Sequence, residues 1–377
     1  MSGQARASGA AWPTQERFHM PAEWEPHEAT WLIWPHNRAD WETKTNAVEW
    51  CYTEMVRHLM RGERVSLVYR SAMVRRRAER CLRLAGVDLD HVDVHVMPVD
   101  RSWIRDSGPI FLVRGPVKHR EVAVSDWAFN GWARYRAWRR DNAVPRRIAM
   151  CLDMRRYPIR VAGPKGMHAV VLEGGSIDVN GCGQLLTTEE CLLGQRQARN
   201  PGLTREEIEQ ALRKGLGVRN VRWLAQGIIG DDTRGHVDDI ARFVGVNTIV
   251  VAVEYDRCDV NHDRLAENLT RLRSMRNERN QPFEIVVLPM PRPVIFDGER
   301  LPASYLNFYI ANDVVLVPTF NDVADREALS ILSELFPTRE VIGIYAGDLI
   351  LGLGALHCVT QQQPRGRCVR PQGQVND

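Results

Sequence analysis

Five residues whose side chains can do chemistry together occupy matching positions in an irregular repeat. They are Asp106 in "WIRDSGP", Glu173 in "LEGGS", His236 and Asp238 in "GHVDD", and Cys358 in "GALHCVT". Each alone has an ordinary structural explanation, since a lone cysteine is most often a small buried hydrophobe. Scattered structural residues need not recur in the same phase of a repeat, however. The shared phase therefore predicts that these side chains meet in one site.

Local spacing indicates which histidine serves the cysteine. His236 and Asp238 are two residues apart, so on a strand their side chains point the same way. His357 and Cys358 are adjacent, so on a strand they point in opposite directions. We therefore expect His236, and not His357, to act as acid and base for Cys358.

One thiol, one imidazole and several carboxylates suit a cationic substrate. Structural zinc prefers thiolates and imidazoles, and carboxylates around a papain-like nucleophile would raise the pKa of its thiol. A guanidinium instead pairs with carboxylates through its planar N–H groups. The thiolate could then attack the central carbon, the imidazole could protonate the departing nitrogen, and water could complete the reaction. The pattern is therefore typical of a site that forms a covalent intermediate with a guanidino group.

The elements that must position these residues form five units, each read as strand, helix, strand and strand. Apolar runs of strand type open the units at 29–37, 121–130, 184–190, 247–256 and 312–322. Helical periodicity follows at 47–60, 146–154, 204–216, 263–275 and 325–336. The third strands, at 102–113, 169–179, 235–245, 303–311 and 355–362, carry the chemical residues. The first unit is longer than the later ones, which predicts an insertion there.

Composition limits the class of protein. The chain has 377 residues and a net charge of +3, which is too near neutrality to indicate a nucleic-acid partner. The basic runs 73–80 and 135–142 are expected to be a solvated helix face and a surface loop. No apolar run is long enough to predict a membrane span or a secretory leader. The eight cysteines are scattered, which favours a reducing, cytoplasmic location.

Longer motifs carry a resemblance to a known family. "WIRDSGP", "LEGGSIDVNGCGQLLTTEECLL", "GDDTRGHVDDIARF", "PASYLNFYIANDVVLVPTFND" and "GALHCVTQQQP" together resemble the agmatine deiminase family, which is grouped with the Porphyromonas-type peptidyl-arginine deiminases. The resemblance covers residues 15–364, and residues 1–14 and 365–377 are expected to be flexible tails. It implies an α/β fold, a five-bladed αβ-propeller with pseudo-fivefold symmetry in a single catalytic domain. It also implies hydrolysis of agmatine to N-carbamoylputrescine and ammonia, without a metal or an organic cofactor, in a polyamine pathway.

The resemblance assigns roles to individual residues. Cys358 matches the nucleophile, His236 the acid and base, and Glu173 the carboxylate that partners this histidine. Asp106 and Asp238 match the carboxylates that bind the guanidinium. The substrate-binding residues are expected to be Trp103, as a pocket aromatic, with Asp232, Arg234 and Gly354.

Several positions depart from the family pattern near the expected far end of the substrate. The usual run Gly-Gly-Gly-Asn-Ile-His is here broken by Leu353 and Ala355. Asp232 stands for a usual Glu, Arg234 for a usual Asp and Asp178 for a usual His. Arg234 could bind a substrate carboxylate, as in arginine or a C-terminal arginyl peptide. Alternatively, it is a surface side chain paired with Asp231 or Asp232.

Three interpretations follow from the sequence. The first is a cysteine-dependent hydrolase of linear amidines acting on a small guanidino molecule, in a chain that could form a homo-oligomer. The second is an amidinotransferase of the same fold, which passes the amidino group to an amine. The third is a binding protein that keeps the pocket without catalysis, which retention of all five chemical residues disfavours.

Overall fold

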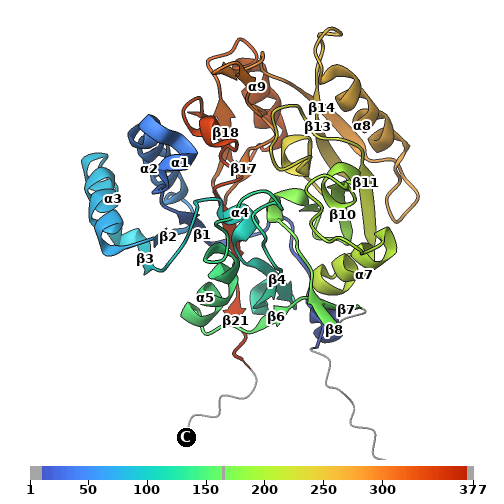
Figure 1. Ribbon diagram of the computed structural model, residues 1–377, viewed down its shortest axis with the longest axis horizontal. Helices are drawn as coiled ribbons and strands as arrows, with labels where there is room; N and C mark the ends of the chain where they lie inside the picture. Colours follow the sequence, from blue (N-terminus) through green and yellow to red (C-terminus); the bar gives the residue numbers. More distant parts are fainter. Residues whose placement is uncertain (1–10, 164–165, 372–377) are drawn as a thin grey trace, which may run out of the picture.

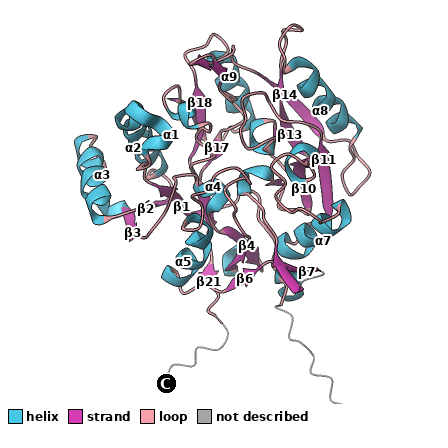
Figure 2. Cartoon of the chain, in the orientation of Figure 1, coloured by secondary structure: helices cyan, strands magenta, loops and turns pink. Residues whose placement is uncertain are grey.

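The computed structural model describes residues 11–163 and 166–371, and within them the chain forms an α/β fold. Figure 1 shows the longer helices around the outside of the molecule and the short helix α4 (Ile104–Ser107) near its middle. Figure 2 shows the strands lying between these outer helices and the centre. The remaining helices are α1 (Arg38–Trp41), α2 (Thr45–Leu59), α3 (Ala72–Leu84), α5 (Val144–Cys151), α6 (Glu189–Leu192), α7 (Arg205–Leu216), α8 (His262–Ser274) and α9 (Asp325–Leu335).

Five sheets in the described part of the chain share one pairing pattern. A central strand pairs antiparallel with one neighbour and parallel with a strand that follows it in sequence. The triplets are β20 (Gln361–Pro364), β1 (His27–Ile33) and β2 (Arg64–Tyr69); β4 (Ile110–Arg114), β5 (Glu121–Asp126) and β6 (Arg156–Pro158); β9 (Asp178–Val179), β10 (Gln184–Thr188) and β11 (Asn220–Leu224); β12 (Ala241–Phe243), β13 (Thr248–Val253) and β14 (Glu284–Pro289); and β17 (Tyr309–Ile310), β18 (Val314–Thr319) and β19 (Glu340–Tyr345).

This pattern confirms the repeat and refines its grouping. The third strand of each predicted unit pairs with the first strand of the following unit, as β9 does with β10. The last third strand, β20, pairs with β1, the first strand of the chain. The extra length of the first unit carries α3 and the strand β3 (Val92–Val96), which extends the first sheet beyond β2.

Burial explains why these segments fold as they do. The central strands are buried on both faces, so β13 and β18 read as continuous apolar runs rather than as alternating ones. The helices bury one stripe each against a sheet. α7 begins with a capping box between Thr204 and Glu207, and its last turn is followed by Gly217 at φ +69°. The five predicted helices are confirmed, with ends displaced by at most three residues.

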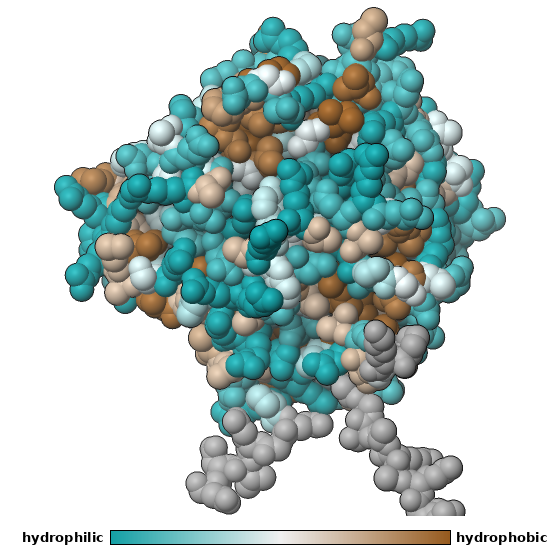
Figure 3. Space-filling view, in the orientation of Figure 1, coloured by the Kyte–Doolittle hydropathy of each residue, from teal (hydrophilic) through white to brown (hydrophobic). Residues whose placement is uncertain are grey.

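One sequence prediction about the surface concerns α3. The basic run 73–80 lies on α3, which buries only Ala78 and Leu82, so the predicted solvated helix face is confirmed. Hydrophilic residues cover most of the face shown in Figure 3. None of the helices in the described ranges has the length and apolar composition that crossing a bilayer requires.

Five short strands complete the sheets of the described residues. β7 (Arg160–Gly163) pairs with β8 (Gly166–Ala169), and β15 (Ile295–Phe296) pairs with β16 (Glu299–Arg300). β21 (Arg367–Cys368) pairs with β5, so the paired part of the chain continues past residue 364, the predicted end of the domain. Of the predicted tails, 1–14 and 365–377, residues 1–10 and 372–377 lie outside the described residues.

Candidate active site

The predicted chemical residues lie on turns that lead into the inner strands. Asp106 is in α4, just before β4, and Cys358 is in a turn before β20. Glu173 and His236 each stand immediately before a single turn of 3₁₀ helix, and Asp238 lies within the second of these turns. The expectation that these residues sit on strands was therefore wrong. Their apolar flanks gave a strand-like pattern, but the tight turns free the side chains from the alternation of a strand.

The turns bring all five side chains together around His236. Its Nε2 atom lies 3.3 Å from Glu173 Oε2. Its Nδ1 atom lies 3.7 Å from Asp106 Oδ1 and 4.0 Å from Asp238 Oδ1. The second oxygen of Asp238, Oδ2, lies 3.9 Å from Cys358 Sγ. The cluster is buried, and Cys358 is its most exposed member, at 9%.

Gly175 makes this close approach possible. A Cβ atom added there would lie 2.6 Å from His236 Nδ1, 2.9 Å from Asp106 Oδ1 and 3.0 Å from Asp238 Oδ2. Its backbone N–H donates to Asp106 Oδ1 at 2.9 Å. Glycine is required here by the space that the three polar groups occupy.

On one side of His236 lies Glu173, which is paired with Arg199. Burial raises the pKa of Glu173, but Arg199, whose Nε donates to it at 3.0 Å, and His236 outweigh that effect and lower the pKa. Burial lowers the pKa of His236, but Asp106, Cys191 and Glu173 raise it well above its usual value. In the free protein His236 is therefore an imidazolium held by an ionised Glu173, and it can donate a proton.

On the other side of the cluster, burial and the nearby carboxylates keep the thiol of Cys358 protonated. Burial, followed by the charges of Asp238, Asp239 and Asp106, raises the pKa of Cys358 well above its usual value. Burial also raises the pKa of Asp106 to about 6, because the charges of Asp238 and Glu173 offset the stabilising charge of His236. A cation bound between these carboxylates would favour the ionised form of both groups.

Asn307 is a site residue that sequence reasoning missed. Its Nδ2 atom lies 3.2 Å from Cys358 Sγ, and its Oδ1 accepts from the backbone N–H groups of His357 and Cys358 at 3.0 and 3.3 Å. It belongs to "SYLNFYIA", the predicted third strand of the fourth unit. The repeat was the signal that could have found it, because this was the one unit for which no chemical residue had been named.

His357 lies in a turn and not on a strand, so the alternation of a strand does not set the direction of its side chain. Its Nδ1 atom lies 2.7 Å from Asp238 Oδ2, and its Nε2 atom lies 2.8 Å from Glu23 Oε2. Its ring is therefore directed at two carboxylates. Glu23 is a second residue that sequence reasoning did not single out.

Trp103 and Gly354 form a wall beside the thiol. A Cβ atom at Gly354 would lie 2.6 Å from Trp103 Cζ3 and 3.1 Å from Cys358 Cβ. Trp103 is 5% exposed, and its ring centroid lies 5.5 Å from that of Trp41. Both predicted residues thus adjoin the nucleophile.

A loop that follows Gly131 covers the other side of the cluster. Trp132 Nε1 donates to Asp106 Oδ2 at 2.8 Å, and Tyr135 Oη donates to Asp232 Oδ2 at 2.6 Å. The guanidinium of Arg134 lies 4.0 Å from Asp232. Asp232 is therefore near the cluster but already hydrogen-bonded, and neither aromatic residue was expected from the sequence.

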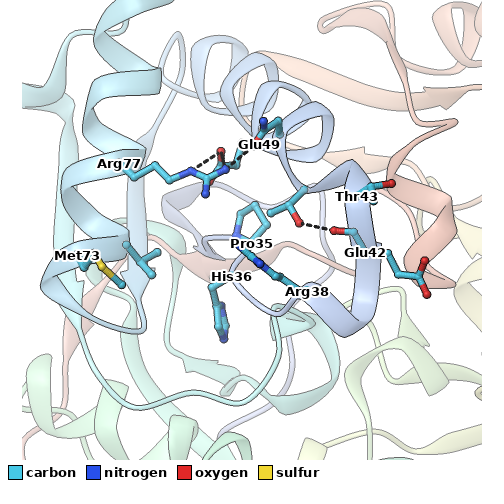
Figure 4. Close-up of a pocket in the computed structure, with 11 residues that line it drawn as sticks. Pro35, His36, Arg38, Glu42, Thr43, Glu49, Met73 and Arg77 are labelled. Atoms are coloured by element: carbon cyan, nitrogen blue, oxygen red, sulfur yellow. Dashed lines mark hydrogen bonds and ion pairs between the residues drawn. The ribbon is translucent and has the colours of Figure 1, made fainter.

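Two further features resemble ligand sites. Atoms of Glu173, Cys191 and His236 lie within 4.8 Å of one another, as metal ligands would, but the Arg199 guanidinium on Glu173 opposes a cation there. A hollow of about 670 Å³ lies between α2 and α3 (Figure 4). Arg77 in its wall is paired with Glu49 at 2.8 Å, and its lining includes none of the clustered residues.

Comparison with known proteins gives a consistent result. The sequence model of the family described as Porphyromonas-type peptidyl-arginine deiminase matches residues 19–364. The chain belongs to this family. Agmatine deiminase of Ectopseudomonas mendocina is 35% identical over 93% of this chain and 97% of its own, and that of Medicago truncatula is 37% identical over 93% and 98%. A structure of agmatine deiminase from Enterococcus faecalis, 30% identical, superposes with a TM-score of 0.85 over 96% of this chain and all of its own.

The departures from the family pattern fall in three places. Asp178, expected near the far end of the substrate, is instead buried in an ion pair with Arg242 and accepts from the backbone of Phe243 at 2.8 Å. Ala355 is 1% exposed and packs in a small apolar cluster, against which Leu353 also lies. Leu353 has φ +69°, a conformation that favours glycine.

Arg234 and Asp232 are departures on the partly exposed segment that precedes His236. We call this segment, with Tyr135 and Arg134 that contact Asp232, the mouth of the cluster. Arg234 Nε donates to Gln197 Oε1 at 3.1 Å, and Gln197 Nε2 donates to the carbonyl of Asp232 at 2.9 Å. Asp231 accepts from the backbone of Gly235 at 2.6 Å and Asp232 from Tyr135. The surface ion pair expected for Arg234 is therefore wrong, because both carboxylates have other partners.

Proposed function

We propose that this chain is a cysteine-dependent deiminase that hydrolyses the guanidino group of a small molecule, with agmatine as the preferred substrate. The observation that carries the proposal is the free oxygen of Asp238. Oδ1 is buried and has no hydrogen-bond partner among the described residues, whereas Oδ2 is bound by His357. An unpartnered buried carboxylate oxygen is unfavourable, and an N–H group of a bound guanidinium would satisfy it.

In the proposed complex, Asp238 and Asp106 hold the guanidinium beside Cys358. The charge of the substrate opposes the carboxylates that raise the pKa of the thiol, and so favours the thiolate. On substrate binding the thiol proton passes to solvent, and the thiolate then forms the S–C bond at the guanidinium carbon as the C=N electron pair moves onto nitrogen. We assign nucleophilic attack to Cys358 and a supporting hydrogen bond to Asn307.

His236 is proposed to transfer protons in both halves of the reaction. As an imidazolium it protonates a terminal nitrogen, the C–N bond breaks, and ammonia leaves an amidino group on Cys358. The neutral imidazole then takes a proton from water, which attacks the same carbon. Breaking the C–S bond releases a ureido product and the free thiol. For agmatine this product is N-carbamoylputrescine, and Glu173 stabilises His236 in its charged form.

Two kinds of side chain could recognise the far end of the substrate. Agmatine would place an amine near Asp232, and relatives named agmatine deiminase support this choice. Arg234 and Arg134 beside Asp232 instead favour a carboxylate, as in free arginine or a C-terminal arginyl peptide. Trp103 and Gly354 are proposed to line the path to the thiol.

A product screen tests the proposal. We expect ammonia and a ureido product from agmatine, in the absence of any added amine, with slower reactions of arginine and arginyl peptides. A requirement for an amine acceptor would identify an amidinotransferase instead. Failure to turn over any guanidino compound would contradict the proposed function.

We further propose that residues 15–364 form a single catalytic domain with five-bladed αβ-propeller architecture. The five sheets with one pairing pattern, and the pairing of β20 with β1, support this arrangement. A crystal structure would test it through the angles between successive sheets. A homo-oligomer and a cytoplasmic location remain predictions from the sequence, to be tested by light scattering and by cell fractionation.

A further inference from the structure

His357 is clamped between two buried carboxylates. Its Nδ1 atom lies 2.7 Å from Asp238 Oδ2 and its Nε2 atom 2.8 Å from Glu23 Oε2. The side chains of His357, Asp238 and Glu23 are 2%, 0% and 7% exposed. Water therefore contributes little to this arrangement, and the three groups must satisfy one another.

The hydrogen bonds fix the ring of His357 in one orientation. Both ring nitrogens face a carboxylate oxygen, so both contacts would be lost if the ring turned away. Burial raises the pKa of both carboxyls, but Arg242 and His357 lower that of Glu23 well below its usual value, and His357 also lowers that of Asp238. An ionised carboxylate accepts hydrogen bonds and cannot donate, so the ring is the donor to it.

Glu23 is itself held by groups from distant parts of the chain. Its Oε1 atom lies 2.9 Å from a terminal nitrogen of Arg242 and accepts from the backbone N–H of Ile310 at 2.9 Å. Its Oε2 atom lies 3.4 Å from the guanidinium of Arg105. The charged groups that face His357 are therefore Glu23 and Asp238, with Arg105 and Arg242 behind Glu23. This leaves Glu23 one orientation toward the ring.

We propose that Glu23 is a positioning residue for the reaction, which holds the ring of His357 so that His357 orients Asp238 beside Cys358. This inference rests on the proposed function, because Asp238 is taken as a guanidinium ligand. The bond to His357 occupies Oδ2, the oxygen 3.9 Å from the thiol, and leaves Oδ1 free for the substrate. If Glu23 released the ring, Asp238 would lose the partner that fixes this orientation.

The first test replaces the Glu23 carboxylate by an amide of the same shape. In Glu23→Gln we expect kcat/KM to fall about 10- to 100-fold, the size seen when a partner that orients a functional group is lost. Alkylation of Cys358 by iodoacetamide in the free enzyme should also move to higher pH. Glu28→Gln, at an exposed position on β1, is the matched control. Unchanged alkylation and turnover in a folded Glu23→Gln would overturn the proposal.

A double-mutant cycle separates action through His357 from a general loss of stability. If Glu23 acts through His357, Glu23→Gln should add little to the effect of His357→Asn on turnover and on alkylation. Additive effects would assign Glu23 a separate, structural role and overturn the proposal.

A measurement on the wild-type protein keeps the inference testable if the variants do not fold. The chain has 11 histidines, and ¹⁵N-labelled histidine with loss of one signal set in His357→Gln would assign the ring. We expect a ring proton of His357 to exchange slowly with water, as a buried hydrogen bond requires, and rapid exchange at both nitrogens would overturn the proposal. Because neither the spectrum nor the alkylation needs a substrate, these results are independent of whether the wild type hydrolyses a guanidino compound.

Discussion

The inner cluster and its mouth are built in different ways. Around His236 and Cys358, every charged group is buried and faces a defined partner, and glycine holds the space between them. At the mouth, Asp232 is bound by Tyr135 while Arg134 and Arg234 present partly exposed guanidinium groups. Buried groups are sensitive to small displacements because solvent cannot screen or replace their partners. The inner cluster therefore determines the reaction, and the mouth can change the substrate at little cost to the reaction.

The strongest test of this contrast removes the nucleophile. Cys358→Ser should lower ammonia release at least about 10⁴-fold, as loss of a nucleophile does in other covalent enzymes. Substrate should still bind, because both carboxylates remain. Cys151→Ser, at an exposed thiol, is the control and should keep full activity. Turnover by folded Cys358→Ser at the wild-type rate would refute the assignment.

A single added methyl group at the centre should have the next largest effect. Gly175→Ala places its Cβ within 3.0 Å of polar atoms of His236, Asp106 and Asp238, so these groups must separate. We expect kcat to fall about 10²- to 10³-fold, as when one preorganised group is misplaced. Gly245→Ala is the control, since its nearest contact would be 3.5 Å away. A melting temperature measured for both variants would identify a mere loss of folding.

The pH dependence of kcat/KM should report the inner cluster rather than the mouth. The pKa of Asp106 is raised to about 6, so kcat/KM should rise with pH through this value as Asp106 ionises. Asp40, paired with Arg101 at 2.6 Å, also has its pKa raised to about 6. If ionisation of Asp106 causes the rise of kcat/KM with pH, the rise persists in Asp40→Asn. Loss of the rise in that variant would mean that Asp40, and not Asp106, sets the pH dependence.

The same shift fixes the sign of a stability effect. The folded state holds a proton on Asp106 more tightly than the unfolded chain, whose carboxyl has a pKa of 3.8. The stabilisation from this group is therefore present at low pH and lost as pH rises from about 4 to about 6.

Much of the inner cluster could be predicted from sequence because it repeats. Asp106, Glu173, His236 and Cys358 recur in one phase, and the same phase would have led to Asn307. The turns that carry them were predicted as strands because apolar residues flank them. A single turn differs from a strand in only a few backbone dihedral angles, which leave no pattern in the sequence. Glu23 could not be found in this way. It lies 334 residues from His357, has no counterpart in the repeat, and acquires its role only from three-dimensional contact.

The smallest expected effects lie at the mouth. Arg234→Ala should raise kcat/KM for agmatine and lower it for arginine, each by a factor of about 2 to 5, because partly exposed charges are screened by solvent. Arg83→Ala, on the exposed side of α3, is the control. The ratio of the two kcat/KM values at low salt is the measurement. An unchanged ratio would mean that Arg234 does not face the substrate.

The pairing of β1 with β20 also has a consequence for how the enzyme is made. β1 emerges from the ribosome long before β20, and the 334 residues between Glu23 and His357 take roughly 20 to 70 seconds to synthesise. During that time the edge of β1 lacks its neighbour, and the turn that carries Cys358 does not yet exist. Contacts so distant in sequence form slowly. We expect the nascent chain to need protection of this edge by chaperones, and ribosome-bound intermediates to remain unreactive toward thiol reagents directed at the site.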